Sequence, residues 1–245
     1  MHSEASTGYP AQDDAPNDYD PALFVNGTPV DSLFLSRLKA SRSLRFKLLV
    51  KRAVDILVGS ALLMATGPLL LLAGLLVALT SKGNMFYMAK RCGMGGKPFT
   101  CFKLRTMFLN QEALLRSHGL TAVGRHGTLL VFDADPRITK IGRCLRKLSI
   151  DELPQLWNVV RGDMSLIGPR ALAVCMLEEF PRINSARSVM RPGITGLWQV
   201  RRRMKNATVA DMIEDDMEYI QRFTLPLDLK IFMLTFPKII EPKVR

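Results

Sequence analysis

The chain has 245 residues, enough for one catalytic domain with appendages, and it carries a formal charge of +12. Its four cysteines are scattered without a CxxC pair, which argues against a zinc ribbon or a disulfide framework and fits a reducing compartment. A chain this basic is expected to seek an anionic partner, such as lipid headgroups, a nucleotide or nucleic acid.

The first 32 residues differ from the rest in composition. They hold six acidic residues and no Lys or Arg, together with four prolines and few aliphatic side chains. Because such a segment buries too little apolar surface to fold, we predict a disordered acidic tail over residues 1–32. The segment lacks the basic start and apolar core of a signal peptide.

Residues 33–52 alternate leucine and phenylalanine with arginine and lysine. This pattern predicts a basic amphipathic helix that lies on an anionic lipid surface. The alternative is a solvated helix that packs on its own domain.

Residues 56–79 contain no charged side chain. A helix of this length, at about 1.5 Å per residue, would span the ~30 Å hydrocarbon core of a bilayer. However, Gly67-Pro68 interrupts the run at its middle, and proline kinks helices. Basic residues also flank both ends, so both ends prefer the cytoplasm. We therefore predict a re-entrant, Pro-kinked membrane helix within residues 33–80, with a single crossing as the alternative.

Residues 81–245 form the predicted catalytic domain. Residues 98–105 alternate in polarity and predict a short strand. Helical patterns follow, and the last of them predicts another interfacial or packing helix. The expected helices cover residues 110–118, 138–146, 149–160, 171–187, 209–223 and 227–240. The predicted fold class is therefore α+β, mainly helical, with short strands in a small catalytic domain.

Two adjacent carboxylates, Asp151 and Glu152, lie in a segment crowded with arginine and lysine. Cations gather where anions are held, and paired carboxylates suit metal binding or covalent chemistry, so this pattern indicates phosphoryl transfer with a divalent metal. A structural alternative exists, because Ser149-x-x-Glu152 also matches a helix capping box.

Six motifs in order give the chain a close resemblance to bacterial sugar transferases of the monotopic phosphoglycosyl transferase family. These are polyprenyl-phosphate hexose-1-phosphate transferases, and the resemblance extends from about Lys51 to Ile240. The motifs are Arg91-x-Gly93-x-x-Gly96-x-x-Phe99, Lys103 to Met107 (KLRTM), Asp135 to Thr139 (DPRIT), Ser149 to Asn158 (SIDELPQLWN), Gly162 to Arg170 (GDMSLIGPR) and Arg191 to Val200 (RPGITGLWQV).

The resemblance implies a defined reaction. Such enzymes transfer a sugar-1-phosphate from a UDP-sugar to undecaprenyl phosphate, release UMP and begin exopolysaccharide or glycoconjugate assembly. By position, Asp151 would be the nucleophile that forms an aspartyl-phosphosugar intermediate, and Glu152 would bind Mg²⁺. The implied location is the cytoplasmic face of the bacterial inner membrane, with a possible homo-oligomer and no nucleic-acid partner.

Six further side chains are candidates for substrate binding. Five cationic groups could clamp phosphates, because guanidinium and ammonium groups bind phosphate oxygens, and one carboxylate lies where the family carries an acidic site residue. They are Lys103, Arg105, Arg137, Arg146, Arg170 and Asp216.

Two positions depart from the family pattern, namely Ala171 after Arg170 and the run Arg201-Arg202-Arg203. Neither change removes a proposed catalytic group. A competing hypothesis is a membrane-tethered binding or scaffold protein for anionic lipid or nucleic acid. That hypothesis explains the positive charge but not the acidic pair inside a cationic segment. Without a metal to bridge them, the two carboxylates would repel phosphate.

Overall fold

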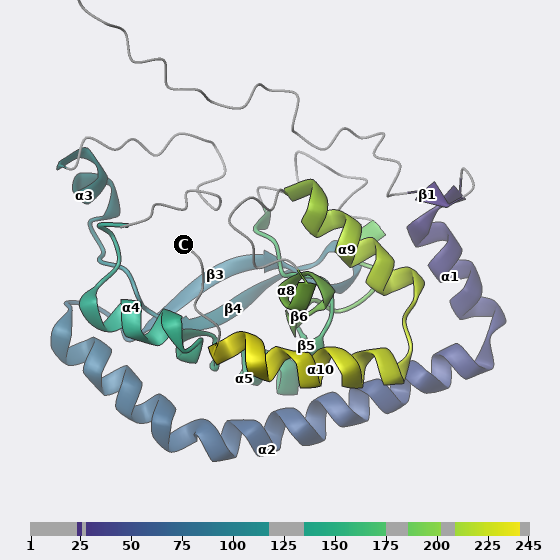
Figure 1. The fold of residues 1–245 in the computed structure, drawn as a ribbon, viewed down its shortest axis with the longest axis horizontal. Helices are drawn as coiled ribbons and strands as arrows, with labels where there is room; N and C mark the ends of the chain where they lie inside the picture. Colours follow the sequence, from purple (N-terminus) through teal and green to yellow (C-terminus); the bar gives the residue numbers. More distant parts are fainter. Residues whose placement is uncertain (1–23, 26–27, 118–134, 175–185, 202–208, 241–245) are drawn as a thin grey trace, which may run out of the picture.

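The structure, a computed structural model, describes residues 24–25, 28–117, 135–174, 186–201 and 209–240 (Figure 1). Helices predominate, and short strands form three two-stranded sheets, so the predicted α+β, mainly helical fold class is confirmed. The helices are α1 (Val30–Ala40), α2 (Arg42–Thr80), α3 (Gln111–Ser117), α4 (Lys140–Lys147), α5 (Gln155–Arg161), α8 (Leu197–Arg201), α9 (Val209–Gln221) and α10 (Leu225–Ile240), with 3-10 turns η3 (Met94–Gly96) and η4 (Ile150–Glu152).

Two of the three strand pairs position the candidate site. Strands β3 (Phe86–Cys92) and β4 (Pro98–Leu104) form an antiparallel hairpin, and β5 (Ser165–Ile167) pairs in parallel with β6 (Gly193–Thr195). The third pair, β1 (Phe24–Val25) with β2 (Thr28–Pro29), precedes α1. Regular structure therefore begins inside the segment predicted as a disordered tail, whereas residues 1–23 lie outside the described residues.

Helix α2 has 39 residues and contains Pro68 without ending there. Figure 1 shows it curved beneath the other elements, with α5 and α10 on its inner side. Within the described residues it is the one helix long and apolar enough to cross a membrane. Its outward face is apolar, since Leu57, Met64 and Leu71 are each at least 70% exposed.

The N-terminal half of α2 is fastened to the domain by buried polar contacts. Lys51 Nζ lies 2.6 Å from Asp228 Oδ2 on α10. The Asp55 carboxylate accepts hydrogen bonds from Ser165 Oγ and Leu166 N. Because a buried charge without a partner is costly, these contacts fix how the helix docks on the domain.

The C-terminal half of α2 packs against the same domain through small and apolar residues. Ala73 and Val77 are buried in a cluster with Leu104 of β4 and Leu145 of α4. A Cβ on Gly74 would lie 2.7 Å from Met85 Sδ, so this close approach favours glycine. Both halves of the apolar helix therefore contact one domain on one side.

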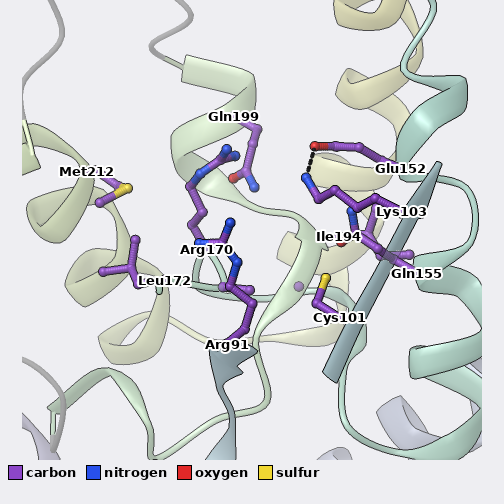
Figure 2. Close-up of a pocket in the computed structure, with 12 residues that line it drawn as sticks. Arg91, Cys101, Lys103, Glu152, Gln155, Arg170, Leu172, Ile194, Gln199 and Met212 are labelled. Carbon is purple, nitrogen blue, oxygen red and sulfur yellow. Dashed lines mark hydrogen bonds and ion pairs between the residues drawn. The ribbon is translucent and has the colours of Figure 1, made fainter. Parts of the chain in front are cut away.

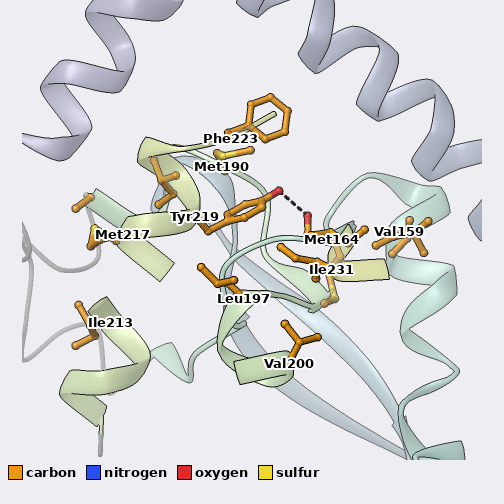
Figure 3. Close-up of a cluster of buried hydrophobic side chains, with 14 of the residues drawn as sticks. Val159, Met164, Met190, Leu197, Val200, Ile213, Met217, Tyr219, Phe223 and Ile231 are labelled. Atoms are coloured by element: carbon orange, nitrogen blue, oxygen red, sulfur yellow. Dashed lines mark hydrogen bonds between the residues drawn. The ribbon is translucent and has the colours of Figure 1, made fainter. Parts of the chain in front are cut away.

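The main core joins α5, α8, α9 and α10 around the β5–β6 pair. Figure 3 shows Met217 and Ile213 of α9, Leu197 of α8 and Ile231 of α10 pointing into it. Tyr219 is fully buried and donates a hydrogen bond to Asp228 Oδ1 at 2.7 Å. The same carboxyl group thus joins the core, α10 and the membrane helix.

Several sequence predictions are confirmed with small shifts of their ends. The expected strand at 98–105 is β4, and the expected helices at 110–118, 138–146, 209–223 and 227–240 are α3, α4, α9 and α10. Strand β3 was not predicted. Most of the helix expected at 171–187 lies outside the described residues, and Ala173 before that gap forms an isolated bridge with Arg91.

Two helix predictions are wrong in detail. The helix expected at 149–160 is divided into η4 and α5 at Pro154, which has no N–H to continue a helix. Ser149 adopts a left-handed conformation (φ 57°), and its side chain makes no capping hydrogen bond. The capping-box interpretation is therefore incorrect. The basic helix expected at 33–52 is divided at Ser41, whose side chain accepts a hydrogen bond from Leu44 N and caps α2.

Candidate functional site

One face of the β3–β4 hairpin supplies three side chains to a cavity. The register pairs Tyr87 with Lys103, Ala89 with Cys101 and Arg91 with Phe99. Successive side chains of a strand alternate between faces, so Arg91, Cys101 and Lys103 share one face. All three line a cavity of about 120 Å³.

The opposite wall is built where the chain leaves β5 and where β6 begins. Gly168 and Gly193 allow two backbone segments to touch, because a Cβ on Gly193 would lie 2.2 Å from Gly168 N. The turn that follows Gly168 carries Arg170, whose side chain lines the cavity (Figure 2). Ala171, one of the departures from the family pattern, lines it as well.

The acidic pair lies in the short turn η4. Asp151 is 8% exposed, and Glu152 reaches the cavity, where Lys103 Nζ donates to its Oε1 at 2.9 Å. Ser149, which precedes this turn, is the sole non-glycine residue with positive φ in the described part of the chain. Strained backbone of this kind clusters at functional sites.

Asn158 of α5 fixes the distance between the acidic turn and the hairpin. It is fully buried, accepts a hydrogen bond from Phe102 N at 3.0 Å and donates to Thr100 O at 2.7 Å. Because both contacts are to β4, α5 and its preceding turn are held beside Lys103. The asparagine of the acidic motif is thus a positioning residue.

The cavity combines three cations with one carboxylate. Figure 2 shows Arg91 and Arg170 on one side and the Lys103–Glu152 pair on the other. Burial raises the pKa of the Cys101 thiol between them, although the positive charges of Lys103 and Arg91 oppose that shift. Such a cluster suits the diphosphate of a nucleotide, since ionised oxygens form strong hydrogen bonds with guanidinium and ammonium groups.

Arg105, predicted as a phosphate clamp, has a structural role instead. It is 6% exposed and donates hydrogen bonds to the carbonyl oxygens of Ser81, Lys82, Gly83 and Asn84. These carbonyls belong to the connection between α2 and β3. Arg105 therefore fastens the chain that leaves α2, outside the cavity.

Arg137 and Arg146 also lie outside the residues that line the cavity. Arg137 is buried and pairs with Asp135, with Nη2 and Oδ2 2.7 Å apart. Burial alone would raise the pKa of Asp135, but the hydrogen bonds and charge of Arg137 hold that pKa below its usual value. Arg146 is half-buried on α4 and donates from Nε to Thr106 Oγ1 at 2.8 Å.

Asp216, predicted to bind substrate, is fully buried behind the cavity wall. Its carboxylate pairs with Arg187, and its oxygens lie 3.3 Å from Arg170 N. Arg187 also donates to Arg170 O at 2.7 Å. The pair holds the Arg170 backbone from both sides, so Asp216 positions a cavity residue.

The protein groups fit a magnesium ion that is completed by substrate. No cluster of three or more His, Cys, Asp or Glu side chains is present among the residues that the structure describes. Mg²⁺ is usually held by one or two carboxylates together with phosphate oxygens and water. Glu152, whose side chain is 30% exposed at the cavity, provides such a ligand.

Sequence reasoning assigned no role to several residues that the structure brings to the site. Arg91, Gln155 and Gln199 lie inside quoted motifs, and all three line the cavity. Arg91 was missed because its strand β3 was not predicted, and the register with β4 places it beside Cys101 and Lys103. No local pattern pointed to Arg187, because its partner is 29 residues away.

Comparison with known proteins gives consistent matches. The family model described as bacterial sugar transferase matches residues 46–242. An exopolysaccharide production protein ExoY of Sinorhizobium fredii is 38% identical over 192 residues, which cover 77% of this chain and 84% of that protein. A UDP-glucose:undecaprenyl-phosphate glucose-1-phosphate transferase of Caulobacter vibrioides is 40% identical over 197 residues, 78% of this chain and 69% of the relative.

A third relative has a different sugar in its name. The UDP-N-acetylgalactosamine-undecaprenyl-phosphate N-acetylgalactosaminephosphotransferase of Aeromonas hydrophila is 37% identical over 198 residues. These residues cover 78% of this chain but 44% of the relative. The names of the second and third relatives thus share a type of reaction and differ in the sugar transferred.

Proposed function

This chain belongs to the bacterial sugar transferase family and is a phosphoglycosyl transferase, and on that premise we propose that it transfers a sugar-1-phosphate from a UDP-sugar to undecaprenyl phosphate. The products would be UMP and an undecaprenyl-diphosphate sugar. The step would begin assembly of an exopolysaccharide or a related glycoconjugate. The names of the relatives support this assignment.

The observation that carries the proposal is the position of the Asp151–Glu152 turn beside three cations. Glu152 shares the cavity with Arg91, Lys103 and Arg170. An acidic pair would repel a diphosphate unless neighbouring cations or a metal offset its charge. A binding module for anionic lipid needs no such pair, so the arrangement favours phosphoryl transfer over the scaffold hypothesis.

The reaction we propose proceeds in two displacements. A carboxylate oxygen of Asp151 attacks the β-phosphorus of the UDP-sugar, the bond between this phosphorus and the bridging oxygen breaks, and UMP leaves. A phosphate oxygen of undecaprenyl phosphate then attacks the same phosphorus and returns the free carboxylate. Covalent catalysis divides one difficult step into two and lets a soluble donor and a lipid acceptor use one site in turn.

The cavity side chains would bind and orient the diphosphate. Arg91 and Arg170 would hold its oxygens, and Lys103 would exchange its contact with Glu152 for a phosphate oxygen when substrate enters. Glu152 would bind Mg²⁺, which would supply charge neutralisation at the diphosphate. The Asp216–Arg187 pair would keep Arg170 in place.

We also propose that α2 is re-entrant and that the catalytic domain lies on the cytoplasmic face of the inner membrane. A domain that contacts both halves of the helix has to lie on one side of the bilayer, unless the helix is pulled away from it. The contacts of Lys51 with Asp228 and of Gly74 with Met85 support this topology.

Single cysteines at Arg45 and Lys82 test the topology. Both side chains are exposed, and Cys144 and Cys175 would first be replaced by serine. We expect a membrane-impermeant maleimide to label both positions in inverted vesicles and neither in intact spheroplasts, because both ends of α2 face the cytoplasm. Labelling of the two positions from opposite sides would mean that the helix crosses the membrane.

UMP release by the detergent-solubilised full chain tests the reaction. We expect release with undecaprenyl phosphate, Mg²⁺ and one member of a panel of UDP-sugars, and loss of release when the metal is chelated. The active donor also identifies the sugar. Silence with every UDP-sugar, from protein shown to be folded, would contradict the proposed function.

A further inference from the structure

Gln199 is held rigidly at the cavity by its neighbours in α8. Leu197 and Val200 are buried in the core, as Figure 3 shows, and they turn the intervening Gln199 toward the opposite side of the short helix. Arg201, two residues after Gln199, forms ion pairs with Asp215 and Glu218 of α9. These contacts leave the Gln199 side chain little freedom to turn elsewhere.

The side-chain carbonyl of Gln199 lacks a hydrogen-bond donor among the described residues. Gln199 is 7% exposed, lines the cavity, and its Oε1 is buried without a partner. Buried polar atoms are paired in the great majority of cases, so each exception requires an explanation. Gln199 lines the cavity, where a ligand can supply the missing donor.

The chemistry of the atom restricts what the ligand can be. A carbonyl oxygen accepts hydrogen bonds, and ionised phosphates carry no hydrogen to donate. The phosphate oxygens also have better partners in Arg91, Arg170 and Lys103. Figure 2 shows Gln199 between Arg170 and the Lys103–Glu152 pair, with apolar Leu172 and Met212 beyond Arg170. The donor to Gln199 Oε1 therefore has to be an O–H or N–H group outside the ionised diphosphate.

We propose that Gln199 Oε1 accepts a hydrogen bond from an O–H or N–H group in the uncharged part of the nucleotide sugar, and so helps to select the donor substrate. The inference rests on the proposed function. Two parts of the substrate carry such groups, the nucleoside and the transferred sugar. A site built to bond such a group discriminates strongly against a molecule that lacks it.

A buried acceptor that remains unpaired until substrate binds should lower the folding stability of the free enzyme. Leaving a buried acceptor unsatisfied costs free energy, which is recovered only when a donor arrives. Replacing Gln199 by an apolar side chain of similar length should therefore preserve or raise the melting temperature of the unliganded protein. A glutamine with a purely structural role would give the opposite result.

The experiment compares wild type with Gln199→Met and Gln199→Leu, and with Gln221→Met as the matched control at the end of α9, outside the cavity. For each full-length protein in detergent, we would measure the melting temperature alone, with UDP and with the active UDP-sugar, and the kcat and KM for UMP release. We expect Gln199→Met to raise KM about tenfold with kcat changed less, and to melt no lower than wild type. Gln221→Met should match wild type throughout.

The two ligands distinguish the sources of the donor group. If the nucleoside donates, Gln199→Met loses the thermal shift caused by UDP as well as by UDP-sugar; if the sugar donates, the UDP shift survives. An unchanged KM in both active Gln199 variants would overturn this inference alone, whatever their melting temperatures. A lower melting temperature together with the unchanged KM would show that Gln199 has a purely structural role. A wild-type protein that releases no UMP with any UDP-sugar would overturn the proposed function and this inference with it.

Discussion

Asp151→Asn should lower the rate of UMP release by roughly four orders of magnitude or more. The amide keeps the size and much of the hydrogen bonding of the carboxylate but is a poor nucleophile, so the first displacement should fail. The measurement is UMP release under single-turnover conditions, with UDP-sugar, Mg²⁺ and undecaprenyl phosphate. Membrane association and melting temperature should change little, because the substitution is isosteric.

The covalent intermediate gives an independent measurement. Wild type incubated with UDP-sugar labelled at the β-phosphate, without lipid acceptor, should retain label after denaturation, whereas Asp151→Asn should retain none. Glu112→Gln is the control, because Glu112 pairs with Arg116 on α3 and lies outside the cavity. This variant should release UMP and retain label within a few fold of wild type. Turnover by Asp151→Asn at the rate of wild type would remove Asp151 from the mechanism.

The elements that sequence predicted well are those with a clear period or a clear boundary. Helices α9 and α10 show apolar positions at helical spacing, and β4 alternates from Pro98 to Phe102. Strand β3 was missed because Phe86, Tyr87 and Met88 are all exposed, so apolar residues fall on both faces and no alternation is visible. The division at Pro154 was also missed, although proline has no N–H to continue a helix.

The candidate site was predictable in its chemistry but not in its geometry. Adjacent carboxylates near many cations indicated phosphoryl transfer, and Glu152 and Lys103 do meet across 49 residues of sequence. Which arginines face the cavity was not predictable, because a guanidinium pairs equally well with phosphate, carboxylate or backbone carbonyls. Arg105 was assigned to phosphate for this reason, whereas its partners are the carbonyl oxygens beyond α2.

Gln199 illustrates a different limit. Its role depends on a missing hydrogen-bond partner, and no pattern of residue types reveals which buried acceptor will remain unpaired. The structure supplies this information because it places α8, β4 and the acidic turn around one cavity. Sequence motifs therefore located the region of the site, and the tertiary contacts within it were needed to assign separate roles.

Arg187→Met should destabilise the folded protein by about 3–5 kcal/mol, because it leaves the Asp216 carboxylate buried without its cation. The same change should weaken donor binding, since Arg187 and Asp216 hold the Arg170 backbone. The measurements are the free energy of unfolding by denaturant and the KM for UDP-sugar. Full stability in this variant would contradict the ion pair.

The pH dependence of stability and a second substitution show why Arg187→Met destabilises the protein. Burial raises the pKa of Asp216, and Arg187 opposes that shift, so removing the arginine should raise the pKa further above its unfolded value. A raised acid pKa means that the folded state binds the proton more tightly, and stability is lost as pH rises through the folded pKa. Arg187→Met should therefore be less destabilised at pH 5 than at pH 8.

Adding Asp216→Asn removes the buried charge and should restore part of the stability with little remaining pH dependence. A double variant no more stable than Arg187→Met would instead mean that packing of the arginine, not its charge, supports the cavity wall.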